Sequence, residues 1–222
     1  MGYGIRVEVW GDYALFSRPE MKVERVSYDM ITPSAARGLI EAIYWHPGLR
    51  WHIDRIHVCN PIRFTNIRRN EVKSKLLSTQ ARSAMNGAAE PIYLNAADDI
   101  QQRASLVLKD VRYVIEAHFT MTEAAKPEDS VGKFTDIIRR RLEKGQIFHQ
   151  PCFGCREFPA HFRALGQEDV AVDKEFLDPP EKDLGYMLYD MDYSDQEDIR
   201  PMFFRAVLKK GVLDLADCGV VS

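Results

Sequence analysis

His118 and Tyr44 are the residues whose types and settings point most directly to chemistry. His118 lies between Ala117 and Phe119 in the strongest strand pattern of the chain, and Tyr44 ends a helical pattern. Histidine suits proton transfer near neutral pH, a tyrosine hydroxyl can orient or exchange a proton, and a Lys or Arg can stabilise negative charge. These types could break an RNA phosphodiester without a metal, because the 2′-OH of the RNA can itself attack the adjacent phosphate. The alternative is a structural histidine and an interface tyrosine.

The chain lacks the short motifs of several other enzyme classes. There is no Walker A loop, no G-x-G-x-x-G after a strand, no H-E-x-x-H and no G-x-S-x-G. Asp98-Asp99 and the pair Asp190 and Asp192 come nearest to paired carboxylates, and we interpret both as loop and strand-face polarity. We therefore expect no cofactor and no catalytic metal.

The cysteines do not form a metal-site pattern. Cys152 and Cys155 make a lone C-x-x-C, without the second pair or the histidines that a structural zinc site needs. The N-terminus enters a strand pattern directly without a secretory signal, and no stretch approaches the roughly 18 apolar residues of a membrane span. We expect a cytoplasmic protein with reduced cysteines and no membrane partner.

Charge is unevenly distributed, although the chain as a whole has a net charge of −3 and a pI of about 6.1. Residues 50–82 are strongly basic, whereas residues 167–199 carry an acidic excess. This pattern favours an anionic ligand at one end and a protein partner at the other, with two ordinary solvated faces as the alternative. The basic residues of the first region are Arg50, Arg55, Arg63, Arg68, Arg69, Lys73, Lys75 and Arg82.

The hydrophobic patterns predict an α+β protein. Residues 5–10 alternate as a half-buried strand, and a helix that begins after Thr32-Pro33 delivers Tyr44 at its end. Residues 51–64 predict a second strand or hairpin arm, and residues 105–122 predict a long strand with a turn or kink at Lys109-Asp110. A second helix spans residues 130–144, and its basic C-terminal half fits either the helix dipole or a contact to phosphate.

The order strand, helix, strands, helix, strand is that of the ferredoxin-like split β-α-β arrangement. We expect a ferredoxin-like domain, of the RRM or RAMP kind, over residues 1–160, with a basic insertion at about residues 60–104. Residues 66–103 predict an irregular binding loop. Residues 161–222 predict a C-terminal β-sheet extension with a tight turn at Lys210-Gly211.

Six segments that occur in order along almost the whole chain resemble one known family. They are GDYALFSRPE (11–20), EAIYWHP (41–47), CNPIRFTNIRRNEV (59–72), LKDVRYVIEAHF (108–119), CFGCREFPA (152–160) and LGYMLYDMDY (184–193). Together they resemble the Cas-five family of CRISPR-associated proteins, in its subtype I-C form, within the RAMP superfamily of ferredoxin-like RNA binders.

The resemblance implies a CRISPR repeat-specific endoribonuclease that needs no metal. Such a protein cuts pre-crRNA at the 3′ base of the repeat hairpin, leaves a 2′,3′-cyclic phosphate, and stays on the crRNA 5′ handle as a subunit of Cascade, beside its backbone and large subunits. The family's Tyr and His match Tyr44 and His118. Its catalytic Lys has no direct match, because Glu116 and Ala117 precede His118, and Lys109 is the nearest basic residue in sequence.

The remaining candidates would hold RNA, largely through its phosphates. They lie in the basic segment, in the long strand and on the second helix, and they are Arg63, Asn66, Arg68, Arg69, Lys73, Lys75, Arg112, Arg139 and Arg140. Arg68, Arg69 and Arg112 are also alternatives for the missing catalytic cation. Two other functions stay open: a Cas-five subunit that binds the crRNA handle without cutting it, and a metal-dependent DNA nuclease.

Overall fold

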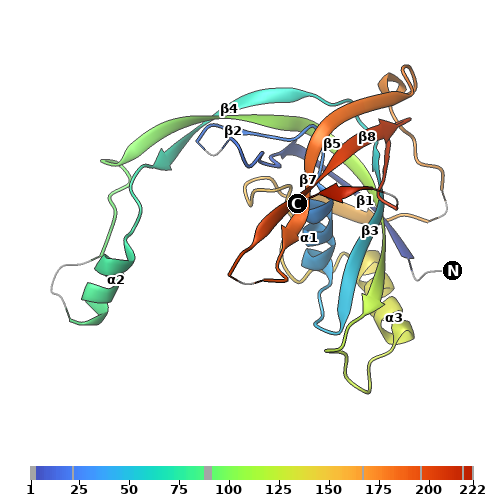
Figure 1. Ribbon diagram of the computed structural model, residues 1–222, viewed down its shortest axis with the longest axis horizontal. Helices are drawn as coiled ribbons and strands as arrows, with labels where there is room; N and C mark the ends of the chain where they lie inside the picture. The colour runs from blue at the N-terminus through green and yellow to red at the C-terminus, as the bar shows by residue number, and fades with distance from the viewer. Residues whose placement is uncertain are drawn as a thin grey trace.

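The computed structural model describes residues 4–21, 23–87, 92–166, 168–195, 197–216 and 218–221. Within these ranges the chain is mostly antiparallel sheet with few helices, which confirms the predicted α+β class (Figure 1). No helix in this part of the chain is long and apolar enough to cross a membrane. The elements are β1 Gly4–Ala14, β2 Arg25–Val26, α1 Pro33–Ile43, β3 Leu49–Val58, β4 Phe64–Val72, α2 Ser78–Met85, β5 Ile100–Met121, α3 Val131–Lys144, β6 His161–Ala164, the 3₁₀ turn η1 Lys174–Phe176, β7 Glu181–Asp192, β8 Arg200–Lys209, β9 Val212–Asp214 and β10 Val220–Val221.

The centre of the sheet consists of β3, β5, β1 and β6 in that order, each antiparallel to its neighbours. Val7 and Val9 of β1 lie opposite Ile115 and Tyr113 of β5, and all four are buried. Since directly opposed residues share a face, one side of the sheet is apolar and carries the core. The alternate residues of the same strands form a second, mainly polar side.

Helix α1 begins where the sequence predicts. Thr32 Oγ1 accepts a hydrogen bond from the Ala35 amide at 3.2 Å, and Pro33 stands in the first turn, where no amide hydrogen is needed. The helix ends at Tyr44, whose amide still donates to the Ile40 carbonyl while its own backbone is extended. The buried stripe consists of Ala36, Leu39, Ile40 and Ile43.

Helix α3 covers the apolar side of the sheet. Ser130 caps its N-terminus, and Gly145 ends it in the left-handed conformation with φ 62°. Phe134 is fully buried and meets Phe119 of β5 edge to face, with ring centroids 6.1 Å apart. The Phe119 side of β5 is therefore the side that α3 covers.

Strand β5 is one strand of 22 residues. As far as Leu108 it pairs with β4, and from Tyr113 onward it pairs with β3. Between these parts Asp110 has φ 52°, a conformation that Asp tolerates better than most side chains. The turn or kink predicted at Lys109-Asp110 is thus a local irregularity at which a continuous strand changes partners.

Residues 64–87 and 92–108 form a long projection that we call the arm. The expectation of an irregular loop over residues 66–103 is wrong at both of its ends, because Phe64–Val72 pairs residue by residue with Ile100–Leu108. Figure 1 shows the arm extending away from the rest of the molecule with α2 near its far end. Both faces of β4 stay partly exposed and α2 buries no residue, so the apolar alternation that announces a strand or helix is missing.

The C-terminal strands continue the same sheet. β9 pairs with β3, and β8 returns to β9 through the tight turn predicted at Lys210-Gly211, where both residues have positive φ. β7 and β10 pair with β8. β6, although it begins only at His161, pairs with β1 in the central sheet.

Candidate active site

The polar side of β5 carries His118. Because side chains alternate along a strand, His118 and Thr120 point away from the side that buries Ala117 and Phe119. His118 therefore faces the open side of the sheet. The antiparallel register of β3 and β5 then sets His52 directly beside His118.

Asp54 holds the His118 ring. Its Oδ1 lies 2.7 Å from His118 Nδ1. The pairing of β3 with β5 shifts register between Ile53 and Arg55, which leaves Asp54 as the extra residue of a bulge whose carboxylate can reach across. A carboxylate can only accept, so the contact selects the form in which Nδ1 carries the proton and leaves Nε2 for proton transfer.

His52 is the second imidazole of the group. Its ring stacks on His118, with centroids 5.0 Å apart and planes 14° apart, and its Nε2 lies 2.9 Å from Thr120 Oγ1. Partial burial lowers the pKa of His52, and the positive charges of His118 and Arg50 lower it further. His52 is therefore neutral over a wider pH range than an ordinary histidine. We refer to His52, Asp54, His118 and Thr120 as the histidine cluster.

Arg50 brings a cation to this cluster. It lies two residues before His52, opposite Thr120, and both Arg50 and His52 line a hollow of about 90 Å³ between α1, β3 and β7. Arg50 forms no ion pair with a carboxylate in the described part of the chain, whereas the neighbouring Arg37 is held by Glu41 and Asp190. The guanidinium of Arg50 is thus available to an anionic ligand.

Tyr44 lies on the other side of the sheet. Its ring centroid is 6.3 Å from that of Phe134, and the Arg141 guanidinium lies over the ring at 5.3 Å. Burial leaves Tyr44 only 8% exposed and raises the pKa of its hydroxyl. Tyr44 and His118 are predicted to meet at one phosphate, but in this structure they lie on opposite sides of the sheet, because Phe134 packs on the Phe119 side of β5 and His118 points to the other side.

Lys109 does not complete the site either. It precedes His118 by nine positions on the same strand, which corresponds to about 30 Å at about 3.3 Å per residue. Its Nζ lies 3.7 Å from Asp110 at the kink of β5. Lys109 therefore lies at the base of the arm, and the structure does not bring it to His118.

Sequence reasoning named Arg50 only as one member of the basic segment, and it did not single out His52 or Asp54. One signal was present, because Arg50, just before the predicted second strand, and His52 alternate with the apolar Trp51 and Ile53. The pairing of that strand with residues 113–121, and the bulge that brings Asp54 to His118, depend on contacts between distant segments. Neither can be read from a local pattern.

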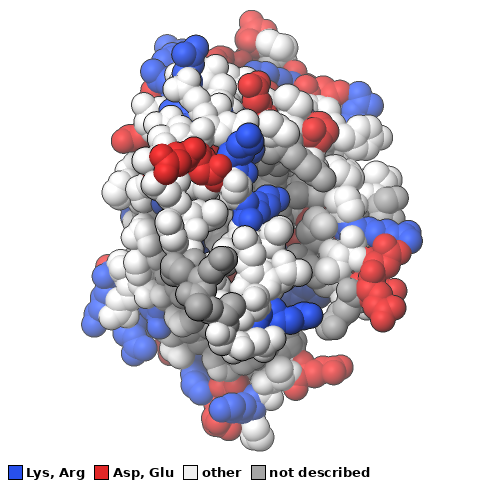
Figure 2. All heavy atoms as spheres, turned by 90° about the vertical axis from the view of Figure 1, so that its left-hand side faces the viewer, with Lys and Arg blue, Asp and Glu red and all other residues white. Residues whose placement is uncertain are grey.

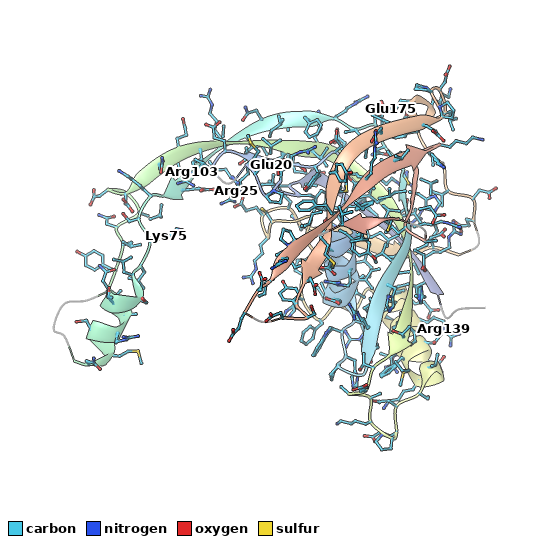
Figure 3. The ribbon with its side chains drawn as sticks, viewed as in Figure 1. Glu20, Arg25, Lys75, Arg103, Arg139 and Glu175 are labelled. Carbon is cyan, nitrogen blue, oxygen red and sulfur yellow. The ribbon has the colours of Figure 1, made fainter. Side chains whose placement is uncertain are left out.

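The predicted RNA-binding residues are spread over the molecule. Figure 3 shows Lys75 on the arm and Arg139 on α3, at opposite ends of the view. Figure 2, which faces the arm end, shows Lys and Arg at separate places among Asp and Glu rather than in one basic field. The exposed members are Arg63, Asn66, Arg68, Lys73 and Lys75 on or next to the arm, Arg112 on β5, and Arg139 and Arg140 on α3.

Arg69 is engaged inside the protein. Alternation along β4 turns it to the side opposite Arg68, where only 12% of its side chain is exposed. Its guanidinium donates to Glu157 at 2.7 Å and to Ser105 at 2.9 Å. Two of its guanidinium nitrogens therefore hold β4 to Glu157 and Ser105 in this structure, and RNA binding by Arg69 stays a prediction.

Arg112 is also tied to an internal partner. It pairs with the buried Glu8, which Arg163 of β6 contacts as well. Burial by itself would raise the pKa of Glu8, but hydrogen bonds from Arg163 and Arg112 hold it below its ordinary value. Arg112 therefore neutralises a buried carboxylate first, and only its exposed edge could meet RNA.

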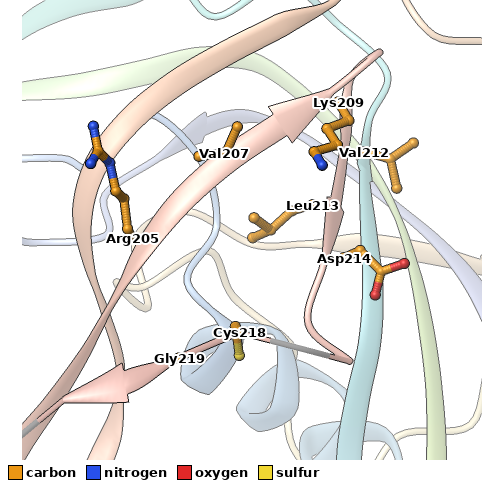
Figure 4. Close-up of a pocket in the computed structure, with 8 residues that line it drawn as sticks. All are labelled: Arg205, Val207, Lys209, Val212, Leu213, Asp214, Cys218 and Gly219. Carbon is orange, nitrogen blue, oxygen red and sulfur yellow. The ribbon is translucent and has the colours of Figure 1, made fainter.

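A larger hollow of about 500 Å³ lies beside β8 and β9 and is lined by none of the histidine cluster (Figure 4). Its cations already have partners, because Arg205 pairs with Asp183 and Lys209 with Glu181. This hollow offers little to a phosphate. In the described ranges no group of three or more His, Cys, Asp or Glu side chains is arranged to hold a metal ion.

Comparison with known sequences places this chain among CRISPR-associated proteins. A family model described as "CRISPR-associated protein (Cas_Cas5)" matches residues 4–215. A protein of Mannheimia succiniciproducens named "CRISPR pre-crRNA endoribonuclease Cas5d" is 49% identical over 217 residues, which cover 97% of this chain and 96% of that protein. A protein of Thermus thermophilus with the same name is 39% identical over 228 residues, covering 95% of this chain and 90% of that protein.

Solved structures share the fold at low sequence identity. One described as "Crystal Structure of CRISPR-associated Protein" superposes with a TM-score of 0.66 at 22% identity, covering 99% of this chain and 96% of the other. A chain of a structure described as "CRISPR RNA-guided surveillance complex" superposes with a TM-score of 0.50 at 13% identity, covering 96% and 91%. These likenesses concern the arrangement of the elements.

Proposed function

This chain belongs to the Cas5 family of CRISPR-associated proteins, and on that premise we propose that it is a pre-crRNA endoribonuclease. The observation that carries the proposal is identity of 49%, over nearly the whole of both chains, to a protein named for that activity. The histidine cluster supports it independently, because it supplies proton-transfer groups on an open face of the sheet.

The reaction that fits these side chains is attack by the RNA's own 2′-OH on the adjacent phosphate, without a metal ion. His118 is its central residue, with Nδ1 bound to Asp54 and Nε2 available for proton transfer. The products are a 2′,3′-cyclic phosphate and a 5′-hydroxyl. Tyr44, buried between α1 and α3, has a structural role in this proposal.

The substrate is the hairpin of the CRISPR repeat, cut at its 3′ base, after which the protein stays on the 5′ handle as a subunit of a type I-C Cascade. The exposed basic residues of the arm and of α3 would hold RNA phosphates from two directions. The order β3-β5-β1-β6, with α1 and α3 as crossovers, supports a ferredoxin-like core of the kind that many RNA binders use.

The test is incubation of the protein with labelled repeat RNA in EDTA. We expect one cut at the hairpin base, and we expect complete loss of that cut when a 2′-deoxy nucleotide stands at the scissile position. Intact RNA with retained binding would indicate a subunit that holds the handle without cutting. Cleavage that requires Mg²⁺ and survives the 2′-deoxy substitution would indicate a metal-dependent nuclease instead.

A further inference from the structure

We propose that His52 is a second catalytic histidine and that Asp54 is the positioning residue of His118, so that the histidine cluster is a two-imidazole acid–base site for RNA cleavage. This inference rests on the proposed endoribonuclease function and names the residues that would perform it. The geometry on which it stands is the stacked pair of rings at 5.0 Å and the 2.7 Å contact between His118 and Asp54.

Both rings are fixed through one nitrogen and leave the other one free. His118 is held through Nδ1 by Asp54, and His52 is held through Nε2 by Thr120. No hydrogen bond to His118 Nε2 or His52 Nδ1 arises from the described residues. The ring centroids are 5.0 Å apart, so the two free nitrogens can contact one phosphate group together. One nitrogen can then serve the attacking 2′ oxygen and the other the leaving 5′ oxygen.

The proposed step moves two protons and replaces one phosphorus–oxygen bond with another. His52 Nδ1 takes the proton of the 2′-OH while the 2′ oxygen forms its bond to phosphorus. The bond from phosphorus to the 5′ oxygen breaks, and protonated His118 gives its Nε2 proton to that oxygen. The RNA ends as a 2′,3′-cyclic phosphate and a 5′-hydroxyl, and proton exchange with water restores both histidines.

The surroundings assign the base role to His52. The groups that face it are His118 of β5, Arg50 and Asp54 of its own strand, Arg37 of α1 and Asp190 of β7. Burial and the nearby positive charges favour its neutral form, and a neutral imidazole is what a base requires. His118 is bonded to Asp54 through Nδ1, which leaves its Nε2 for the oxygen that departs.

Arg50 supplies the cation that this reaction needs. Negative charge develops on the phosphorane oxygens, and a positioned guanidinium stabilises it. Arg50 lines the same hollow as His52 and forms no ion pair within the described part of the chain. It therefore takes the place that the family resemblance would give to a lysine.

A purely structural role is the competing account of this cluster. Under that account His52 and His118 only satisfy each other and their neighbours on a polar sheet face, and replacing His52 changes stability rather than chemistry. His57 provides a matched control, because it lies on the same strand and its Nε2 contacts Glu116 at 3.1 Å on the polar side, outside the cluster.

The experiment compares His52→Asn and Asp54→Asn with His57→Asn under single-turnover conditions with saturating protein. We expect the rate of cleavage to fall about 10²–10⁴-fold in His52→Asn, the range typical of a positioned acid or base. We expect a smaller fall in Asp54→Asn and a change of no more than about twofold in His57→Asn. Affinity for a 2′-deoxy repeat RNA and the melting temperature report whether each variant is folded.

Two further readouts separate the roles of the histidines. Wild-type cleavage should slow at low pH as His52 gains a proton, and His52→Asn should lose that acidic limb. A repeat RNA with sulfur in place of the scissile 5′ oxygen has a leaving group that needs no proton, so it should rescue His118→Ala and fail to rescue His52→Asn.

The outcomes distinguish this inference from the proposed function. If wild type cuts and a folded, RNA-binding His52→Asn cuts at the wild-type rate, the two-histidine site is wrong while the endoribonuclease stands. If wild type does not cut, the proposed function fails first. Rescue of His52→Asn by the sulfur substrate would reverse the assignment of acid and base and overturn the proposal as stated.

Discussion

The two residues that the family resemblance joins, His118 and Tyr44, lie in opposite environments. His118 stands on the polar side of the sheet, half exposed, with a carboxylate and a second imidazole against it. Tyr44 stands on the covered side, against Phe134 and under Arg141. One setting favours proton exchange with a ligand, whereas the other favours packing.

The difference teaches that strand alternation decides which residue can act. Moving one position along β5, from His118 to Phe119, turns the side chain from the open face of the sheet to the core. Burial raises the pKa of the Tyr44 hydroxyl, so this tyrosine is a poorer proton donor than an exposed one. The comparison predicts that the two residues fail in different ways when they are replaced.

The largest expected effect is that of His118→Ala on cleavage. We expect the single-turnover rate to fall about 10²–10⁴-fold, because a positioned proton-transfer group is lost. Affinity for a 2′-deoxy repeat RNA should change little, since the ring makes no essential packing contact with the core. Cleavage within about threefold of wild type by the folded variant would remove His118 from the reaction and leave the polar side without a known role.

Sequence patterns foresee the elements of this fold but not how they combine at the site. The cap Thr32 and the turn at Lys210-Gly211 act through neighbours in sequence, so local patterns suffice for them. Asp54 of β3 reaches His118 of the adjacent β5 because of a bulge, and this contact depends on the register of the two strands. Strand β4 of the arm could not be predicted for another reason. Both of its faces are partly exposed, so its sequence lacks the alternation of apolar and polar residues that indicates a strand.

The next effect concerns stability and comes from Tyr44→Ala. The substitution removes a buried ring that packs on Phe134 and lies beneath Arg141. We expect unfolding by urea to report a loss of about 3 kcal/mol, in the range for aromatic residues replaced by Ala in cores. Tyr44→Phe keeps the ring and should cost less than about 1 kcal/mol.

The matched measurement on Tyr44→Phe is its single-turnover cleavage rate. We expect a change of no more than about threefold, since the hydroxyl lies on the side of the sheet away from the histidine cluster. A loss of about a hundredfold with unchanged stability would mean that Tyr44 acts in the chemistry. It would then require the end of α1 to open when RNA binds.

A smaller effect separates Arg69 from Arg68 on β4. Arg69→Ala removes the hydrogen bonds to Glu157 and Ser105, and we expect it to destabilise the protein by about 1.5 kcal/mol. Arg68→Ala should leave stability within about 0.5 kcal/mol and weaken RNA binding instead. The slope of log affinity against log salt concentration should become shallower by about one, which corresponds to one lost phosphate contact. The reverse pattern would mean that the arm turns its other face to RNA.

The smallest expected effect is that of Lys109→Ala. The Lys109 side chain is half exposed, and its Nζ lies 3.7 Å from the Asp110 carboxylate. Surface ion pairs of this kind contribute about 0–1 kcal/mol, so stability should hardly change. The cleavage rate at saturating protein should stay within about twofold of wild type, because the residue lies some nine positions along β5 from His118.

Arg50→Ala, measured beside Lys109→Ala, should slow cleavage by well over tenfold if a guanidinium stabilises the phosphorane. Should Lys109→Ala be the slower of the two, the cation of the site would come from the arm, and the bound RNA would have to fold the arm back over the polar side of the sheet.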